Sequence, residues 1–171
     1  MTIPFTSTPA IIDVEASGFG AQSYPIEIGI ALPNGQRFCK LIRPFPQWQY
    51  WDDKAQAVHG ICYADLLAYG EDPIAVCLAL NAHAKDMTLY SDAWVVDHPW
   101  IVKLFAQAAV RMEFSISSLE MVLSEPQIAL WDDEKLSVIE NCGLKRHRAS
   151  SDAFIIQQTF LRTRSRMHHS Q

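Results

Sequence analysis

Apolar residues occur along this chain in runs, and near its beginning the runs are short and closely spaced. Three of them predict strands, over Ala10 to Val14, Ile26 to Leu32 and Gln36 to Ile42. The sequence Pro-Asn-Gly at 33–35 predicts a tight turn between the second strand and the third. Connections this short are typical of antiparallel neighbours, so the chain is expected to begin with a three-stranded meander.

The middle of the chain predicts a helix, a strand and a second helix. Asp72 is a good N-cap, a proline fills the first helical position, and the Ala/Leu-rich run to Lys85 continues this helix. Met87 to Tyr90 predicts a short strand, and helical spacing of apolar residues begins again at Val96. The aromatic, turn-rich stretch 47–70 predicts irregular chain with short helical pieces at most.

The last part of the chain predicts two further helices. One covers Pro126 to Asn141 and is followed by Gly143 at the usual stop position. The other is expected to be capped by Ser150 or Ser151. A strand meander followed by alternating helices and strands predicts one α/β domain over residues 1–171, with a mixed sheet covered by helices.

Charge adds one feature to this picture. The net charge is −5, which argues against a protein that wraps a long duplex through phosphate contacts. Residues 143–171 hold six of the 14 Lys and Arg but only one of the 19 Asp and Glu. This segment is therefore the candidate for facing phosphate groups, and a solvated basic tail is the alternative.

The sequence also bears on location and on metal chemistry. No stretch approaches the roughly 18 apolar residues that a membrane span needs, and residues 1–10 have no signal-peptide pattern. We therefore expect a cytoplasmic protein without a membrane partner. The four cysteines are scattered and form no CxxC pair, which argues against a structural zinc site.

Two groups of polar residues stand out as candidates for chemistry. Asp13 and Glu15 end the first predicted strand, although a DxE pattern alone is common and could be a strand end that reaches solvent. His147 and Asp152 belong to a segment, 147–153, that matches HxAxxDA at its four specified positions. The first three of these positions should match by chance only about once in ten thousand. The competing interpretation is the basic beginning of a capped helix.

Asp97 is a third candidate, because it lies at the beginning of a helix that follows a strand. An aspartate in a first helical turn most often complements the helix dipole. Asp92 also follows the strand and competes with Asp97 for a functional role. We favour Asp97, because only it is followed by apolar residues three and four positions later, Trp100 and Ile101.

These residues, in this order, resemble the three motifs of the DnaQ-like 3′–5′ exonucleases, in the branch called DEDDh. The matching residues are Asp13 and Glu15 in the first motif, Asp97 in the second, and His147 and Asp152 in the third. The segments 24–29 (YPIEIG) and 58–61 (VHGI) also resemble that family. The second motif departs from it, because relatives often carry an Asn shortly before the aspartate and this chain has SDAWVV at 91–96.

The resemblance implies a fold and an activity. The fold is RNase H-like, a five-stranded mixed sheet whose first three strands are antiparallel and whose last two are parallel, flanked by helices. The activity is hydrolysis of the phosphodiester bond at the 3′ end of DNA or RNA, which releases nucleoside 5′-monophosphates. Two Mg²⁺ ions, for which Mn²⁺ should substitute, would be held by Asp13, Glu15, Asp97 and Asp152, and His147 would act as general base.

Phe19, His59 and Ile61 are expected, by the same resemblance, to contact the terminal nucleotide. Phe19 would stack on a base, with a core aromatic as the alternative, and His59 could equally be a structural histidine. A catalytically silent module that binds nucleic acid or a polymerase is the rival function, and an unrelated α/β interaction domain is a third. The sequence leaves open DNA or RNA, single strand or duplex, the pathway, and homodimerisation, which is common among stand-alone relatives.

Overall fold

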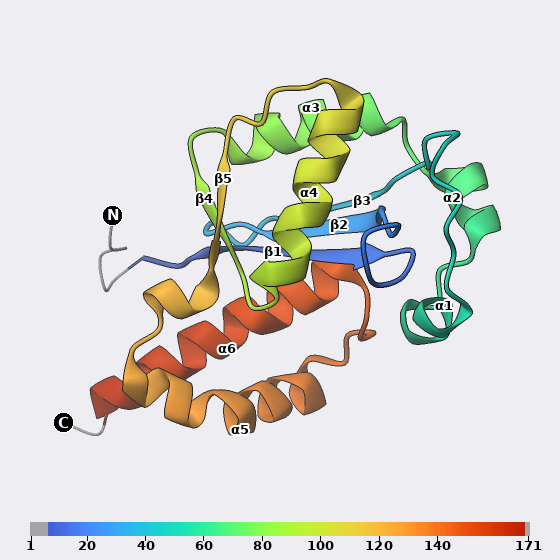
Figure 1. Cartoon of the computed structure of the whole chain (residues 1–171). Coiled ribbons are helices and arrows are strands. Elements are labelled where there is room, and N and C mark those ends of the chain that lie inside the picture. The colour runs from blue at the N-terminus through green and yellow to red at the C-terminus, as the bar shows by residue number, and fades with distance from the viewer. Residues whose placement is uncertain (1–6, 170–171) are drawn as a thin grey trace.

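The computed structural model describes residues 7–169, and its centre is a sheet in the strand order β3-β2-β1-β4-β5 (Figure 1). The strands are β1 (Ala10–Ala16), β2 (Pro25–Ala31), β3 (Arg37–Leu41), β4 (Thr88–Ser91) and β5 (Ser115–Ser118). The pairs β1–β2 and β2–β3 are antiparallel, whereas β1–β4 and β4–β5 are parallel. The mixed sheet expected from the sequence is confirmed.

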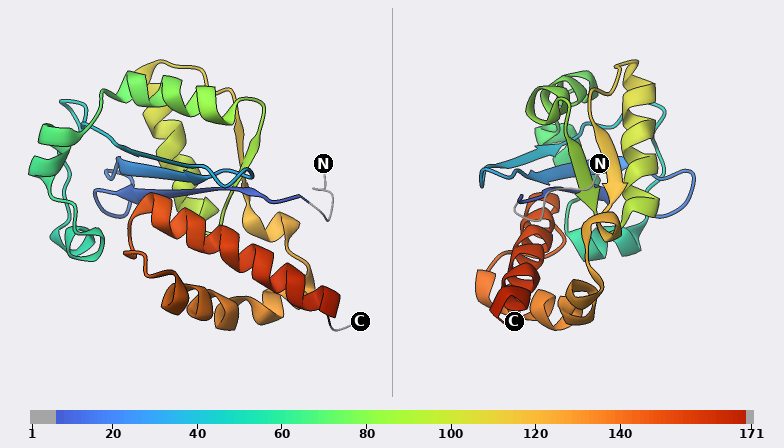
Figure 2. Two further views of the ribbon diagram at one scale, coloured as in Figure 1. Left: turned by 180° about the vertical axis from the view of Figure 1, so that it is seen from behind. Right: turned by 90° about the vertical axis from the view of Figure 1, so that its left-hand side faces the viewer.

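Helices cover both faces of the sheet. They are α1 (Asp53–His59), α2 (Tyr63–Tyr69), α3 (Pro73–Ala84), α4 (Trp94–Ala108), α5 (Glu125–Cys142) and α6 (Ala149–His169), with a 3₁₀ turn at Leu119–Val122. Figures 1 and 2 show α3 and α4 on one face, α6 on the other with α5 outside it, and α1 and α2 beyond the carboxyl end of β1. No described helix is long and apolar enough to cross a membrane.

The alternation of side chains along β1 decides which residues face which layer. Ile12 and Val14 belong to the core beneath α3 and α4, whereas Ile11 packs in the second core, against α6. Successive side chains of a strand point to opposite faces, so Asp13 and Glu15 share the α6 face with Ile11. The first motif is thereby directed toward the beginning of α6.

The first turn of α6 approaches the sheet where β2 has no side chain. A β-carbon at Gly29 would overlap the backbone of Ala149 and Ser150. This close approach places Asp152, one turn later on α6, beside β1. A glycine in a strand often marks such a backbone contact.

We expect Gly29→Ala to displace the first turn of α6 from β1, because the added methyl overlaps the backbone of Ala149 and Ser150. Overpacking of this kind also costs about 1–3 kcal/mol of stability. Ile30→Val, on the other face of β2, is the matched control, since it costs about 0.5–1.5 kcal/mol without displacing α6. Equal hydrogen-exchange protection of the first turn of α6 in the two variants, measured well below their unfolding temperatures, would contradict this role of Gly29.

Some boundaries differ from those expected. The helix α6 begins at Ala149, so Ser150 and Ser151 lie in its first turn and do not cap it. Their hydroxyls instead accept hydrogen bonds from Nη2 of Arg37, at 2.8 and 3.4 Å. The segment 47–70, expected to be irregular with short helical pieces at most, contains two helices of seven residues each, α1 and α2.

Candidate active site

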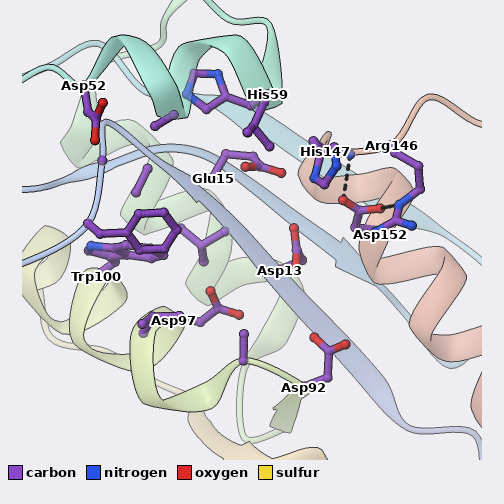
Figure 3. Close-up of a pocket in the computed structure, with 18 of the residues that line it drawn as sticks. Asp13, Glu15, Asp52, His59, Asp92, Asp97, Trp100, Arg146, His147 and Asp152 are labelled. Atoms are coloured by element: carbon purple, nitrogen blue, oxygen red, sulfur yellow. Dashed lines mark hydrogen bonds and ion pairs between the residues drawn. The ribbon is translucent and has the colours of Figure 1, made fainter. Parts of the chain in front are cut away.

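A cavity of about 460 Å³ at the carboxyl end of β1 brings the three motifs together. Its wall includes the five motif residues Asp13, Glu15, Asp97, His147 and Asp152. Figure 3 shows their side chains converging from β1, from α4 and from the beginning of α6. Residues that lie more than 130 positions apart in the chain thus share one site.

Asp13 and Glu15 form the centre of this site. Burial raises the pKa of Asp13 well above its usual value of 3.8, and the nearby carboxylate of Asp97 raises it further. Burial and the carboxylate of Asp152 raise the pKa of Glu15 to about 8. Such shifts mean that burial and mutual repulsion disfavour the ionised carboxylates, a cost that a bound divalent cation would offset.

Asp97 is held in this cluster by a serine. Its side chain is 2% exposed, and its Oδ2 accepts a hydrogen bond of 2.6 Å from the hydroxyl of Ser91. That hydroxyl also accepts a hydrogen bond from the backbone N–H of Ala93. Burial raises the pKa of Asp97 to about 7, although the Ser91 hydrogen bond opposes the shift. Ser91 therefore orients Asp97.

Asp92 lies at the edge of the same cavity in a different environment. Its Oδ2 pairs with Nζ of Lys135, a residue of α5, at 2.7 Å, and its side chain is 25% exposed. Asp97 is almost fully buried and is one of the carboxylates that raise the pKa of Asp13 most. The geometry therefore favours Asp97 over Asp92 as the carboxylate of the second motif.

In the third motif, residues 146 and 147 donate hydrogen bonds to the carboxylate of Asp152. Oδ1 of Asp152 accepts a hydrogen bond from Nε of Arg146 at 2.7 Å, and Oδ2 accepts one from the backbone N–H of His147 at 2.8 Å. His147 is exposed and adopts a left-handed backbone conformation with φ 57°. Ligand atoms of Glu15, His147 and Asp152 lie within 4.8 Å of one another, so these three could hold a metal ion together.

A buried ion pair anchors the segment that carries His147. Glu27 of β2 is fully buried and lies opposite Glu15 in the antiparallel register. Its carboxylate accepts hydrogen bonds from the guanidinium of Arg148, at 2.5 to 3.1 Å, and from the backbone N–H of Ala149 at 2.9 Å. Neither Glu27 nor Arg148 was predicted from the sequence to belong to the site, although Glu27 is a charged residue inside the apolar strand β2.

Phe19 and Trp100 form an aromatic edge of the cavity. The Phe19 side chain is 73% exposed, so the alternative of a core aromatic is excluded. Its ring centroid lies 6.4 Å from that of Trp100, whose Nε1 donates to the hydroxyl of Ser23 at 2.8 Å. Trp100 is thereby fixed, whereas Phe19 offers an open face. The sequence indicated Trp100 only as an apolar residue of the second motif.

His59 and Ile61 differ in their relation to the cavity. The ring of His59 lines it although only 2% of the residue is exposed, and its Nδ1 accepts a hydrogen bond from the backbone N–H of Ile61 at 3.0 Å. Nε2 of His59 is buried without a hydrogen-bond partner among the described residues. In contrast to the expectation from the sequence, the side chain of Ile61 packs in the core and is not part of the described cavity wall.

The raised pKa values predict how stability depends on pH when no metal is bound. The usual pKa values of Glu15 and Asp97 are 4.5 and 3.8, whereas in the folded protein they are about 8 and about 7. Between these limits the folded state binds more protons than the unfolded state, so the free energy of unfolding falls as the pH rises from about 4 to about 8. Each pKa unit corresponds to about 1.4 kcal/mol, before a reduction for partial exposure to solvent.

Thermal unfolding in EDTA at pH 5 and pH 8 measures this effect. We expect a lower midpoint at pH 8 by several degrees, since about 1 kcal/mol shifts the midpoint of a protein of this size by about 2–4 °C. Excess Mg²⁺ or Mn²⁺ should remove most of the difference, because a bound cation compensates the same carboxylates. A midpoint that is constant or rises between these pH values in EDTA is the contrary outcome.

Comparison with known proteins supports the fold. No protein-family model matches the sequence, and no curated protein shows significant similarity to it. Solved structures of Escherichia coli exonuclease I are similar. The complex with a dA16 oligonucleotide has a TM-score of 0.66 and 14% identity, over 90% of this chain and 40% of that chain. The zinc-bound complex with single-stranded DNA has a TM-score of 0.71 and 14% identity, over 94% and 41%.

The match to exonuclease I is partial in length and low in sequence identity. This chain spans about 40% of the length of the exonuclease I chains that it matches. At 14% identity the similarity shows that the two proteins share a fold. Because one fold hosts different functions, the activity has to be argued from the residues of the site.

Proposed function

We propose that this chain is a metal-dependent 3′–5′ exonuclease of the DnaQ-like, DEDDh type, and that its 171 residues form one catalytic domain. The proposal depends on one observation, the convergence of four carboxylates and an imidazole from three distant segments in one cavity. The shared fold with exonuclease I agrees with a nuclease. An unrelated interaction domain would have no reason to bury several carboxylates together, because the burial destabilises it.

The donor set fits divalent cations. Mg²⁺ prefers carboxylate oxygens and retained waters, and Asp13, Glu15, Asp97 and Asp152 supply such oxygens from separate elements. Burial raises the pKa of three of them, and a divalent cation held between them would favour their ionised forms. When bound, a pair of such ions supplies the charge that stabilises the attacking and leaving oxygens of a phosphodiester.

The residues of the chain have separate tasks in this proposal. Asp13 is placed at the centre, since the carboxylates of both other motifs raise its pKa. His147 is the general base that takes a proton from the attacking water, since an imidazole titrates near neutral pH. The hydrogen bond from its backbone N–H to Asp152 and the Glu27 anchor hold this residue beside the carboxylates.

The nucleotide at the 3′ end would be bound at the aromatic edge of the cavity. Every base has a π-face, so stacking on Phe19 accepts any sequence and contributes about 1–3 kcal/mol per base. His59 lines the same cavity and is placed in this proposal beside the terminal nucleotide. A shallow dependence of binding on salt is expected, because only a few terminal nucleotides would be held.

Phe19→Ala should raise KM for a short oligonucleotide by about tenfold and change kcat much less, because the stacking face contributes to binding. The control is Tyr69→Ala on α2, which also removes an aromatic ring that is highly exposed, 74% in this case, but lies outside the cavity wall. Steady-state kinetics with a 3′-labelled strand measures both values. A Phe19 variant with unaltered KM would remove stacking from the proposal.

A substrate panel tests the function itself. Short DNA and RNA strands, single and paired, with either a free or a blocked 3′ end, are incubated with Mg²⁺, with Mn²⁺ and with EDTA. We expect nucleoside 5′-monophosphates from free 3′ ends and no product in EDTA. Cleavage of blocked ends would overturn the direction of digestion, whereas binding without cleavage would favour the silent nucleic-acid module.

A further inference from the structure

Arg146 contacts the carboxylate cluster directly, and most of its guanidinium remains available. Its Nε donates to Oδ1 of Asp152 at 2.7 Å, and the side chain is 36% exposed. No hydrogen bond from its two terminal nitrogens is found within residues 7–169. The side chain lines the cavity beside His147, as Figure 3 shows.

The guanidinium of Arg146 neutralises a carboxylate that could serve a divalent cation. Oδ1 of Asp152 accepts a hydrogen bond from Arg146, and Oδ2 accepts one from the backbone N–H of His147. Asp152 is also one of the three residues whose ligand atoms lie within 4.8 Å of one another. A divalent ion bound by these residues and the guanidinium of Arg146 would repel each other, so the two cations compete for the Asp152 carboxylate.

Release of this side chain would leave its loop in place. The backbone N–H of His147 keeps its bond to Asp152, and Glu27 keeps its bonds to Arg148 and Ala149. These contacts fix the backbone on both sides of His147 without any contribution from the guanidinium. The Arg146 side chain can therefore move while the candidate base stays where it is.

Few basic side chains of the cavity wall could bind a phosphate of the strand. The described wall of the cavity carries six carboxylates, on Asp13, Glu15, Asp52, Asp92, Asp97 and Asp152, against three Lys or Arg, on Lys54, Lys135 and Arg146. Lys135 is paired with Asp92, and Arg146 is the one of the three that touches the motif carboxylates. A guanidinium presents a planar fork of N–H donors that matches the oxygens of a phosphate.

We propose that Arg146 is a phosphate-binding residue that a metal ion releases from Asp152, so that metal binding prepares the site for the nucleic-acid strand. This inference rests on the proposed nuclease function. It assigns Arg146 two alternative partners, the carboxylate in the metal-free protein and a phosphate of the strand in the loaded one. Removing the side chain should therefore change the two affinities in opposite directions.

The first measurement is calorimetric titration of Mn²⁺ into wild type, Arg146→Ala and Arg146→Lys. We expect Arg146→Ala to bind Mn²⁺ several-fold more tightly, because the competing cation is gone. The matched control is Lys145→Ala, which removes one exposed positive charge from the neighbouring position. Its Mn²⁺ affinity should stay within twofold of wild type. Unchanged or weaker Mn²⁺ binding by Arg146→Ala would overturn the proposed competition.

The second measurement is fluorescence anisotropy of a 5′-labelled dT₈ strand with saturating Mn²⁺, in a His147→Ala background that suppresses cleavage. Adding Arg146→Ala should weaken strand binding about tenfold, and Arg146→Lys should recover part of the loss because it keeps the charge without the fork. Unchanged strand affinity on adding Arg146→Ala would overturn the phosphate contact. If the wild type binds neither Mn²⁺ nor the strand, the proposed function fails with it. If the wild type binds and cleaves while Arg146→Ala behaves identically, only this inference fails.

Discussion

Asp13→Asn is expected to lower turnover by about 10³-fold or more and, at the same time, to stabilise the metal-free protein. Asn keeps the shape of the side chain but removes the negative charge that a divalent ion needs. Residues that act as one unit in catalysis lose most of the unit's effect when a central member is removed. Calorimetric titration with Mn²⁺ should show a weakened or missing binding site in the same variant.

The stability effect has the opposite sign, because the carboxyl of Asp13 is unfavourable where it lies. Burial and the carboxylates of Asp97 and Glu15 raise its pKa, so ionisation of Asp13 opposes folding. Asn removes this penalty, and the unfolding midpoint in EDTA at pH 8 should rise by several degrees. With excess Mg²⁺ the order should reverse, since only the wild type gains stability from the ion.

Asp92→Asn is the matched control for this prediction. It makes the same change at the edge of the same cavity, on a side chain that is 25% exposed and paired with Lys135. We expect turnover within about tenfold of wild type and a midpoint shift of no more than a few degrees, because exposed ion pairs contribute about 0–1 kcal/mol. If Asp92→Asn lost activity and Asp13→Asn kept it, the assignment of the carboxylates would be wrong.

The apolar runs of the sequence predicted β1 to β4, including the edge strand β3, and did not predict β5 at the other edge. The runs of β1 and β2 are mostly apolar, since helices cover both of their faces. The strand β5, by contrast, has the sequence SISS, in which only Ile116 is buried. Four residues with one apolar side chain give neither an apolar run nor a clear alternation. The position of β5 is set by tertiary pairing, which no local pattern records.

Some residues of the candidate site could be recognised in the sequence, and others could not. Asp13 with Glu15, and His147 with Asp152, were recognisable because each pair is defined by short spacing in the sequence. The contact between Glu27 and Arg148 joins residues 121 positions apart, so only the folded chain shows it. A short local pattern therefore identified the motif pairs, and the anchor that holds the third motif had to be seen in three dimensions.

The assignment of Ile61 to the nucleotide site shows that a short sequence match does not determine where a side chain points. Gly60 adopts a left-handed conformation with φ 69° at the end of α1, and the chain turns there. After this turn His59 remains at the cavity wall, while the side chain of Ile61 enters the core. The family resemblance placed both residues at the nucleotide, and it gave no direction for their side chains.

Replacing His147 should lower kcat by about 10² to 10⁴ while strand binding is retained, if its ring is the general base. The side chain is exposed at the cavity and lies close to Glu15 and Asp152, so a water held by these carboxylates would be within its reach. His98→Ala is the matched control. That ring stacks on Trp94 at 5.3 Å and is not part of the described cavity wall, so its loss should change kcat less than about threefold.

The residue that replaces His147 decides whether a variant tests the loss of the imidazole or a change in the backbone conformation. Because φ is 57° there, Ala introduces strain of about 1 kcal/mol, whereas Asn tolerates the left-handed region well. His147→Asn therefore keeps the local conformation and the N–H bond to Asp152 but cannot take up a proton at neutral pH. We expect His147→Asn to be as inactive as His147→Ala in single-turnover digestion of a 3′-labelled strand. Recovery of most activity by Asn would mean that position 147 acts through its backbone, and the base would have to be sought elsewhere.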